Sequence, residues 1–363
     1  MKLACIVGAR PNFVKMAALV EEIRRRPGLE YRLIHTGQHY SPEMSHSFFE
    51  ELEIPPPDVN LEVGSGTPVA QTAEIMKRIE PVLAEAAPDV VVVVGDVNST
   101  LAGALVASKL DLWLAHVEAG LRSFDRSMPE EINRVVTDAV SDLLFVSEPS
   151  GERNLLAEGV PQGKIFFAGN VMIDTLLRFR VKAERSDVLD RLRLEPGGYA
   201  VATLHRPSNV DQAGSLAGLM SALADISRSL PVVFPVHPRT AQALSAQSRD
   251  REGAVSGRIL TIPPQGYLDF LHLMSRARLV LTDSGGIQEE TTILQVPCLT
   301  LRENTERPVT IEQGTNRLVG TNPEKIVEAA RVVLDSPPPS GRVPELWDGK
   351  ASQRILDVLT ARH

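Results

Sequence analysis

The chain has 363 residues, a formal net charge of −8 at pH 7 and 43% hydrophobic residues, a composition typical of a soluble globular protein. At about 150 residues per domain, this length predicts two domains. The negative charge argues against general nucleic-acid binding, because neutralising phosphates requires a basic face. The two cysteines, Cys5 and Cys298, are too few for a disulfide framework or a zinc cluster.

No stretch of the sequence has the features of a secretory leader or a membrane helix. The apolar run at the N-terminus is too short for the core of a signal peptide, and Arg10 follows it almost at once. The longest aliphatic run, at residues 90–94, has the length of a strand and is far below the ~20 residues that a membrane helix needs. We therefore expect a cytoplasmic protein that does not bind membranes.

Short β-branched runs alternate with longer amphipathic stretches along the whole chain. In the first half we expect a helix over residues 12–26 and strands over residues 3–7, 31–35, 90–94, 112–117, 143–146 and 165–168. In the second half we expect helices over residues 216–229 and 287–294 and strands over residues 200–204, 232–236, 259–262, 279–282 and 298–301. This alternation predicts α/β units with right-handed crossovers and parallel sheets.

Two such series predict an α/β protein with two Rossmann-like domains and a cleft between them. We expect an N-terminal domain over residues 1–169 and a C-terminal domain over residues 170–345, with the boundary near Gly169. A last helix, over residues 352–359 within the terminal segment 346–363, is expected to pack back on the first domain. Ligands of open α/β sheets bind beyond the carboxyl ends of the strands. Polar residues lie at or just after the ends of the predicted strands in both halves: Arg10, Asp96, His116, Glu118, His205, His237, Gln265 and Asp283.

A phosphate-binding turn is predicted where the strand over residues 279–282 runs into Ser-Gly-Gly and then a helix. The two glycines let backbone N–H groups approach a phosphate, and the helix N-terminus favours negative charge. Glu289 and Glu290, one turn into the helix, are placed to accept ribose hydroxyls. The same residues also fit a tight turn in which Asp283 or Ser284 caps the helix. Neither a Walker A pattern nor Gly-x-Gly-x-x-Gly occurs, so the sequence does not support ATP or NAD as a ligand.

Acidic residues follow two strands of the first half. Asp96 comes directly after the strand over residues 90–94, although it is equally suited to cap a helix. His116 and Glu118 lie on one face of a strand by its two-residue period. Because an acid at the end of a buried strand is costly unless it is hydrogen-bonded, we expect Glu118 to be functional.

Glu130 has a structural explanation in its own neighbourhood. Ser127 and Glu130 have the spacing of a capping box, and Pro129 suits the first turn of a helix. Glu130 is also four residues before Arg134, the spacing of a helical ion pair. From the residues alone, Glu130 is interpreted as structural.

Basic residues and a histidine complete the set of candidates. Arg10, in the loop after the first strand, can bind a diphosphate through a bidentate, charge-assisted pair, although a lone arginine is more often solvated. Lys15 follows five residues later. His205 follows a strand and precedes Arg206-Pro207, so the next helix cannot begin at once.

Eight motifs occur in one order along nearly the whole chain. They are Gly8-Ala-Arg-Pro-Asn-Phe-Val-Lys15, His35-Thr-Gly-Gln-His39, Gly95-Asp96, His116-Val-Glu-Ala-Gly-Leu-Arg122, Pro129-Glu-Glu-Ile-Asn-Arg134, Thr203-Leu-His-Arg206, Asp283-Ser-Gly-Gly-Ile-Gln-Glu-Glu290 and Thr305-Glu-Arg-Pro308. Each is weak alone, but eight in this order are highly specific. Together they resemble the non-hydrolysing UDP-N-acetylglucosamine 2-epimerases.

The resemblance implies a glycosyltransferase-B-like fold, a homodimer, no cofactor and no metal. It implies a catalytic set of Asp96, Glu118, Glu130 and His205, which overrides the structural interpretation of Glu130. It also implies a substrate-binding set in which the turn at residues 284–286 lies at the diphosphate and two of the residues lie near uracil. This second set is Arg10, Lys15, Arg122, Gln265, Phe270, Ser284, Gly285, Gly286, Glu290 and Arg307.

Two departures from the family pattern affect the expected regulation. Some members carry Arg-Glu where this chain has Pro207-Ser208, and a different sequence where this chain has Tyr40-Ser41-Pro42. Both regions lie near a second, activating UDP-sugar site in the family. The departures argue against activation by a second substrate molecule.

The implied reaction inverts C2 of the sugar, whose hydrogen is not next to a carbonyl. Breaking the C1–O bond to UDP first makes the C2 hydrogen acidic, so that a carboxylate removes it and leaves a 2-acetamidoglucal and UDP. Proton return on the other face and re-addition of UDP give UDP-N-acetylmannosamine, a precursor for polysaccharide synthesis. No Asp-x-Asp pair occurs and His237 is isolated, so no metal is expected.

Four other functions fit the same sequence. The substrate can be another UDP-2-acetamido sugar, such as a diacetamido uronate. The enzyme can hydrolyse its substrate to UDP and free N-acetylmannosamine, or it can be a glycosyltransferase of the same fold. The fourth is a catalytically inactive module that binds nucleotide sugars. The complete set of Asp96, Glu118, Glu130 and His205 argues against this function.

Overall fold

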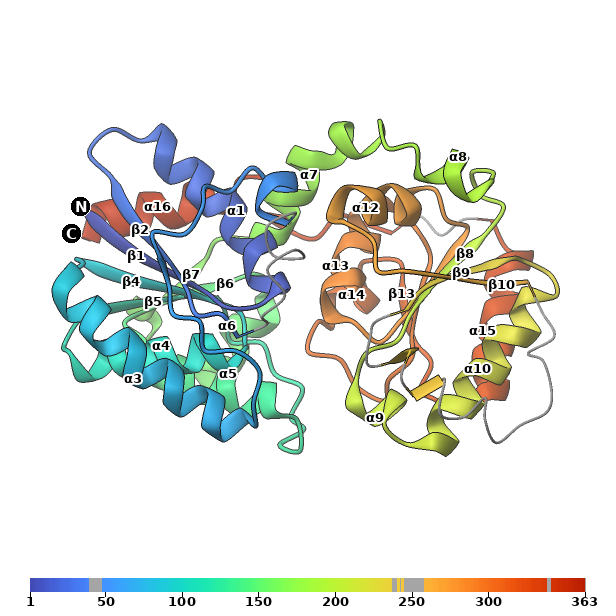
Figure 1. Ribbon diagram of the computed structural model, residues 1–363, viewed down its shortest axis with the longest axis horizontal. Helices are drawn as coiled ribbons and strands as arrows, with labels where there is room; N and C mark the ends of the chain where they lie inside the picture. The colour runs from blue at the N-terminus through green and yellow to red at the C-terminus, as the bar shows by residue number, and fades with distance from the viewer. Residues whose placement is uncertain (39–47, 237–239, 242, 245–257, 338–340, 363) are drawn as a thin grey trace. The chain divides into compact units, whose positions relative to one another are not determined.

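The computed structural model describes residues 1–38, 48–236, 240–241, 243–244, 258–337 and 341–362 (Figure 1). The chain divides into two compact units, which are described one at a time. The N-terminal unit comprises Met1–Arg178 and Glu345–His363, and the C-terminal unit comprises Phe179–Pro344.

The N-terminal unit is built on a parallel sheet of seven strands in the order β3-β2-β1-β4-β5-β6-β7. The strands are β1 Lys2–Val7, β2 Glu30–His35, β3 Val59–Asn60, β4 Val90–Val94, β5 Trp113–Ala119, β6 Leu143–Val146 and β7 Ile165–Phe167. Its helices are α1 Arg10–Arg25, α3 Pro68–Ala86, α4 Asn98–Lys109, α5 Pro129–Val140, α6 Pro149–Ala157, a 3-10 turn at Gln162–Lys164, α7 Val171–Ala183 and α16 Ala351–Arg362. Figure 1 shows α3, α4 and α5 along one face of this sheet and α1 with α16 along the other.

Strand β4 explains why this sheet is covered on both faces. Its five valines are all buried, as expected for a central strand of a parallel sheet. On one face, Ile6 and Val93 of the sheet pack against Ile79 of α3 and Ala104 of α4. Because all the strands are parallel, their carboxyl ends lie at one edge, and the loops that follow β1, β4 and β5 emerge there.

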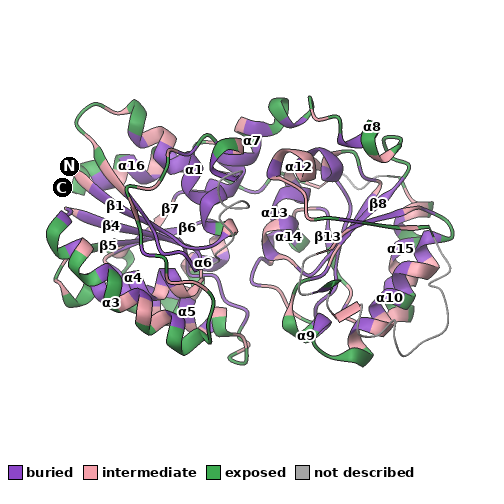
Figure 2. Cartoon of the chain, in the orientation of Figure 1, coloured by how far each residue is buried: buried purple, intermediate pink, exposed green. Residues whose placement is uncertain are grey.

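The C-terminal unit has a parallel sheet of six strands in the order β10-β9-β8-β11-β12-β13. The strands are β8 Ala200–Thr203, β9 Val232–Pro235, β10 Ile259–Ile262, β11 Leu279–Thr282, β12 Cys298–Thr300 and β13 Asn316–Leu318. The helices within it are α8 Val188–Leu192, α9 Pro207–Val210, α10 Ala213–Ser227, α12 Tyr267–Ser275, α13 Gly285–Leu294, α14 Val309–Glu312 and α15 Pro323–Asp335. Figure 2 shows buried strands, and helices with exposed outer faces such as α10 and α15.

Every strand predicted from the sequence is present, with ends that move by one or two residues. The fold class is therefore confirmed as two parallel α/β units. Two short strands, β3 and β13, were not predicted. His237 and the segment Tyr40-Ser41-Pro42 lie outside the described residues.

The boundary between the units falls within helix α7, after Arg178, and so later than the boundary predicted near Gly169. The first half of α7 belongs to the N-terminal unit because its side chains bond there. Thr175 Oγ1 donates to the carbonyl of Val14 at 2.7 Å, and Asp174 accepts the backbone N–H of Ser352 at 2.7 Å. The second of these bonds also ties α16 to the N-terminal unit.

No helix in the described part of the chain is long and apolar enough to cross a membrane.

Candidate functional site

The start of α1 brings two cations to the carboxyl edge of the N-terminal sheet. Arg10 is the first residue of α1, and its guanidinium carbon lies 4.6 Å from the ring centre of Phe48, within the range of a cation–π contact. Burial lowers the pKa of Arg10, and Glu51 acts in the opposite direction. Lys15 is buried on the next turn, where it forms an ion pair with Glu118.

Glu118 lies on a β-bulge of β5. The register of β5 against β6 shifts between Val117 and Ala119, and Glu118 has a φ of 71°, in the left-handed region that non-glycine residues rarely adopt. Such strain is typical of functional positions that the surrounding structure holds in place. The bulge interrupts the two-residue alternation from which His116 and Glu118 were placed on one face.

Gly95, at the end of β4, lies against this ion pair. Its φ is +67°, and a Cβ there would lie 2.8 Å from Lys15 Nζ and 3.2 Å from a carboxylate oxygen of Glu118. A side chain at this position would therefore displace the pair. The glycine lets the backbone before Asp96 pass close to the two charged groups.

Asp96 is held by Arg134 of α5. The two form an ion pair in which the Arg134 side chain is only 2% exposed and the Asp96 side chain is 25% exposed. Arg134 also pairs with Glu131, whose carboxylate accepts the backbone N–H groups of Ser123 and Phe124 at 2.9 Å each. Asp96, α5 and the loop at residues 123–124 thus form one hydrogen-bonded network.

Two local predictions around Glu130 are wrong. Helix α5 has Met128 as its N-cap with no side-chain cap, and the Ser127 hydroxyl donates to Asp125 at 2.6 Å, so the capping box does not form. Arg134 pairs with Asp96 and Glu131 instead of Glu130. Within the described residues, the half-buried Glu130 forms no hydrogen bond or ion pair.

Arg122, which the family resemblance assigns to substrate binding, makes its contacts within the N-terminal unit. Its guanidinium is buried, and it pairs with Asp138 at 2.7 Å, with Glu158 at 2.7 Å and with the carbonyl of Leu121 at 2.8 Å. These contacts use Nε and both terminal nitrogens. We assign Arg122 to the framework behind the bulge and propose no contact with substrate for it.

The edge of the C-terminal sheet carries His205 after β8 and Asp283 after β11, its neighbouring strand. His205 Nδ1 lies 2.8 Å from Asp283 Oδ1, with the histidine side chain 47% exposed and the aspartate fully buried. Burial alone would raise the pKa of Asp283, but the His205 imidazole and the backbone N–H groups of Arg206 and His205 hold it below its ordinary value.

Helix α13 begins at the predicted phosphate-binding turn. Ser284 is its N-cap with no side-chain cap bond, and Gly285 and Gly286 are its first two residues. A Cβ at Gly285 would lie 2.4 Å from Nη1 of Arg307, so only glycine lets this guanidinium approach the start of the helix. Arg307 is held by Glu289 at 2.8 Å and by Glu306 at 2.6 Å. A cation and a helix N-terminus thus meet at one place, which suits an anionic ligand.

Glu290, on the same helix, is a buried acid. Burial raises the pKa of Glu290 to about 8, with the Tyr267 hydroxyl opposing this and Glu289 adding to it. The Tyr267 hydroxyl donates to Glu290 Oε1 at 3.2 Å. At neutral pH, a protonated Glu290 can both donate and accept hydrogen bonds, as the hydroxyls of a ribose require.

We expect Glu290→Gln to stabilise the C-terminal unit increasingly as the pH rises from 5 to 8. The folded protein holds the Glu290 proton up to about pH 8, whereas the unfolded chain releases it near 4.5, so ionisation favours unfolding in this window. The neutral amide removes that cost, which for a pKa raised from 4.5 to about 8 is on the order of 4 kcal/mol. Thermal denaturation of the variant and the wild type at pH 5 and pH 8 measures this difference in stability. The exposed Glu328→Gln is the control, and equal effects of Glu290→Gln at both pH values would contradict the prediction.

The predicted uracil contacts lie just before α12 and within it. Gln265 is half-buried and donates from Nε2 to the carbonyl of Pro263 at 2.6 Å, and Phe270 is half-exposed on α12. Tyr267, also on α12, bonds to Glu290 of α13. The two helices that carry the proposed uracil and ribose contacts are therefore linked to each other.

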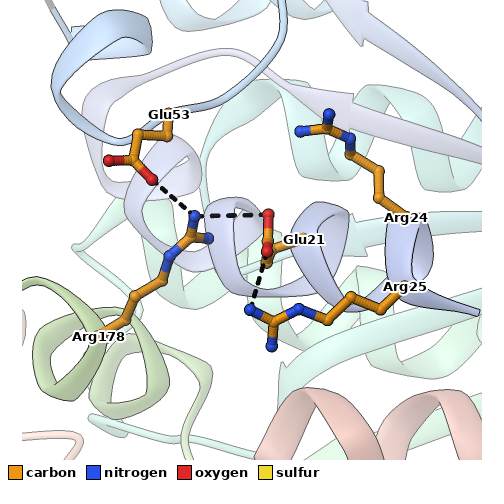
Figure 3. A pocket seen from close by; sticks show the side chains of 5 residues that line it. All are labelled: Glu21, Arg24, Arg25, Glu53 and Arg178. Carbon is orange, nitrogen blue, oxygen red and sulfur yellow. Dashed lines mark hydrogen bonds and ion pairs between the residues drawn. The ribbon is translucent and has the colours of Figure 1, made fainter.

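The surface hollow of Figure 3 coincides with none of the predicted site residues. It is lined by Arg24 together with Glu21, Arg25, Glu53 and Arg178, whose charges largely compensate one another (Figure 3). Arg178 pairs with Glu53 at 2.9 Å and with Glu21 at 3.4 Å, and Arg25 pairs with Glu21 at 2.9 Å. This group ties α7 to α1 and is structural.

No three His, Cys, Asp or Glu side chains in the described parts of the chain are grouped so that they could hold a metal ion.

Sequence reasoning missed two acids that hold the predicted residues in place. Asp283 was expected at the carboxyl edge of the sheet, with a helix cap as the alternative explanation, but its contact with His205 was not predicted; the pairing of β8 with β11 brings the two together. Glu131 was passed over beside Glu130, although its position three residues before Arg134 was visible. Both contacts depend on the tertiary structure.

Two parallel sheets flanked by helices, with acids at one carboxyl edge and a glycine-led helix beside an arginine at the other, define an α/β enzyme of the glycosyltransferase-B-like type. A family model described as UDP-N-acetylglucosamine 2-epimerase matches residues 21–360. The chain belongs to the UDP-N-acetylglucosamine 2-epimerase family, and it is therefore an isomerase.

Individual relatives are similar over the whole chain. The chain is 44% identical over 371 residues to the UDP-N-acetylglucosamine 2-epimerase of Methanocaldococcus jannaschii, and the match covers 99% of this chain and 99% of that protein. It is 41% identical over 363 residues to the UDP-2,3-diacetamido-2,3-dideoxy-D-glucuronate 2-epimerase of Pseudomonas aeruginosa, again with 99% of each covered. A crystal structure of the Methanocaldococcus jannaschii enzyme in complex with UDP-GlcNAc and UDP matches with a TM-score of 0.92 at 44% identity, covering 99% of this chain and 100% of that one.

Proposed function

We propose that the protein is a non-hydrolysing epimerase that interconverts UDP-N-acetylglucosamine and UDP-N-acetylmannosamine. The observation that carries this is the similarity, over both chains, to an epimerase whose structure contains UDP-GlcNAc and UDP. The acids of the N-terminal unit and the anion-binding helix of the C-terminal unit supply the two chemistries that the reaction needs.

The residues of the C-terminal unit would hold UDP. The backbone N–H groups at Ser284 and Gly285 and the guanidinium of Arg307 suit the diphosphate. Glu290 suits the ribose hydroxyls because it both donates and accepts. Phe270 would pack on uracil.

The acids of the N-terminal unit would move the C2 proton. When the C1–O bond breaks, UDP leaves with the bonding electrons, a carboxylate takes the C2 proton, and a C1–C2 double bond forms. Return of a proton to the opposite face of C2 and re-addition of the UDP oxygen to C1 reverse these changes with inverted configuration. Glu118, Glu130 and Asp96 form the pool of groups for the two proton transfers.

A second substrate has a specific observation in its favour. The Pseudomonas aeruginosa relative, at 41% identity, carries the name of an epimerase of UDP-2,3-diacetamido-2,3-dideoxy-D-glucuronate. That sugar has the same 2-acetamido group and needs the same chemistry at C2. Parallel assays with both nucleotide sugars would decide between them.

Proton NMR in deuterium oxide tests the proposed function. The purified protein is incubated with UDP-N-acetylglucosamine, and we expect UDP-N-acetylmannosamine with deuterium at C2. Free N-acetylmannosamine with UDP would move the protein to the hydrolysing class. No reaction would contradict the proposed substrate, and turnover of the diacetamido uronate would then identify the alternative.

We expect the activity to be unchanged after dialysis against EDTA. The developing negative charge of the leaving diphosphate would be met by the side chains of Arg10, Arg307 and His205, so the reaction needs no Lewis acid. The measurement compares initial rates before and after chelation, with added Mg²⁺ as the control. Loss of activity that a divalent cation restores would contradict the prediction.

We also propose that the protein works as a homodimer in the cytoplasm and supplies an N-acetylmannosamine donor for polysaccharide synthesis. Both cysteines are free, buried thiols, which suits a reducing compartment. Light scattering after size-exclusion chromatography measures the oligomeric state.

A further inference from the structure

The pair formed by His205 and Asp283 has a more specific arrangement than a surface ion pair. Asp283 Oδ1 lies 2.8 Å from His205 Nδ1, and the aspartate is fully buried whereas the histidine side chain is 47% exposed. The two residues follow β8 and β11, which pair in parallel with Thr203 opposite Thr282. The sheet itself therefore sets the distance between them.

Asp283 also fixes the backbone that carries His205. Its Oδ2 accepts the backbone N–H groups of His205 and Arg206 at 3.0 Å each and the side-chain amide of Asn209 at 3.1 Å. With Oδ1 on the imidazole, every hydrogen bond that this carboxylate forms with the described residues is to the segment at residues 205–209. Asp283 thus holds both the turn and the ring.

The contact determines where the imidazole carries its proton. A carboxylate only accepts hydrogen bonds, so Nδ1 must bear the hydrogen. The other ring nitrogen, Nε2, forms no hydrogen bond with the described residues, and the exposed ring leaves it open to a ligand. A second proton would therefore bind at Nε2, the atom that can face a substrate.

The charges around the pair suit an anionic ligand. Arg206 donates from Nε to the backbone carbonyl of Asp283 at 3.1 Å, and its Nη2 lies 3.5 Å from Glu306. Glu306 is also paired with Arg302 and Arg307. Three arginines thus share one buried glutamate next to the turn that holds His205.

We propose that Asp283 is a positioning residue that orients His205, fixes its Nδ1–H tautomer and directs Nε2 at the departing diphosphate of the nucleotide sugar. This rests on the proposed function. When the diphosphate binds, Nε2 takes up a proton from the solvent and keeps it through the step. As the C1–O bond breaks and the β-phosphate oxygen keeps the bonding electrons, the ring donates a hydrogen bond from Nε2 to that oxygen. Asp283 stabilises the imidazolium from the opposite side, as in other carboxylate–histidine pairs.

Replacing Asp283 with asparagine should reverse the tautomer. In the wild type, Oδ2 of Asp283 accepts three N–H donors, so the amide oxygen of the asparagine would take the place of Oδ2. The amide NH₂ group would then take the place of Oδ1 and face Nδ1 of His205. Nδ1 must then become the acceptor, and the hydrogen moves to Nε2. Nitrogen-15 NMR of the histidine rings reports this change directly, with the His205 signals assigned by comparison with His205→Gln.

The experiment measures the tautomer of His205, the kcat and the affinity for UDP in the wild-type protein and in Asp283→Asn. We expect the Nδ1–H tautomer in the wild type, the Nε2–H tautomer in the variant, and a fall in kcat on the order of 10- to 100-fold. UDP should bind more weakly to the variant. The matched control is Asp174→Asn, since Asp174 is a buried carboxylate that accepts backbone N–H groups of Ala351 and Ser352 in the other unit.

Three results would overturn the proposal: an Nε2–H tautomer in the wild type, a tautomer that does not change in Asp283→Asn, or an unchanged kcat and UDP affinity in that variant. The first needs no variant, so it applies even if Asp283→Asn does not fold. A wild-type protein that fails to convert UDP-N-acetylglucosamine would contradict the proposed function instead. In that case the tautomer and the UDP affinity still decide the role of Asp283.

Discussion

Glu118→Gln should lower kcat by about 10²- to 10⁴-fold, the range lost when a general acid or base is removed. Glu118 is held on a bulge at a φ of 71° and is paired with Lys15, so its carboxylate is fixed at the carboxyl edge of the sheet. The amide keeps the size of the side chain but can no longer accept the C2 proton. Steady-state kinetics and deuterium incorporation at C2 both measure this loss.

The control for Glu118→Gln is Glu152→Gln in the same unit. Glu152 accepts a hydrogen bond from Gln162 at 2.8 Å, and it lies on α6, outside the proposed catalytic set. We expect this variant to keep its rate. If Glu118→Gln exchanged the C2 hydrogen as fast as the wild type, Glu118 would not take part in proton transfer, and Glu130 and Asp96 would carry it.

Asp138→Asn should destabilise the N-terminal unit by about 3 to 5 kcal/mol, the usual cost of breaking a buried ion pair from one side. Asp138 bonds to His116 Nδ1 at 2.6 Å, to Arg122 at 2.7 Å and to the backbone N–H of Gly120 at 3.0 Å. His116 in turn bonds to the carbonyl of Gly95 through Nε2 at 2.8 Å. The variant therefore loosens both sides of the bulge, and a fall in Tm of roughly 10 °C is expected.

The destabilisation by Asp138→Asn should shrink in acid. Burial alone would raise the pKa of Asp138, but the His116 imidazole and Arg122 hold it below its ordinary value. The stabilising effect of the ionised group is therefore present above about pH 4, where the carboxyl of the unfolded chain is ionised, and is lost as the pH falls through the lower folded value. Melting curves between pH 3 and 7 measure this, with Asp190→Asn as an exposed control. A difference that stayed constant with pH would contradict the explanation.

Most of the fold could be predicted because its strands are continuous apolar runs. The five valines of β4 form a run that is apolar on both faces of the strand. Such a run is typical of a central strand in a parallel sheet that is covered on both faces. The strands β3, with two residues, and β13, with the sequence Asn-Arg-Leu, could not be predicted. Each pairs with a neighbouring strand, and each has only one apolar residue, too few to form an apolar run.

The candidate site was predicted less well than the fold because its geometry depends on contacts between distant residues. The period of a strand cannot reveal the bulge at Glu118. The spacing of four residues favoured a pair between Glu130 and Arg134, but Asp96, thirty-eight residues away in the chain, takes that partner. Either Asp283 or Ser284 could cap the next helix by sequence, and only the pairing of β8 with β11 shows that Asp283 contacts His205.

The N-terminal unit is made from both ends of the chain, and this sets the order in which the protein can fold during synthesis. Helix α16 is bound to α1 by Arg26, which donates to Asp357 at 2.7 Å, and buried Trp347 donates to the carbonyl of Ser147 at 2.8 Å. These partners are synthesised after Phe179–Pro344, which is one uninterrupted segment and forms the C-terminal unit. The unit that is synthesised first is therefore completed last, and until then its nascent chain exposes apolar surface that chaperones recognise.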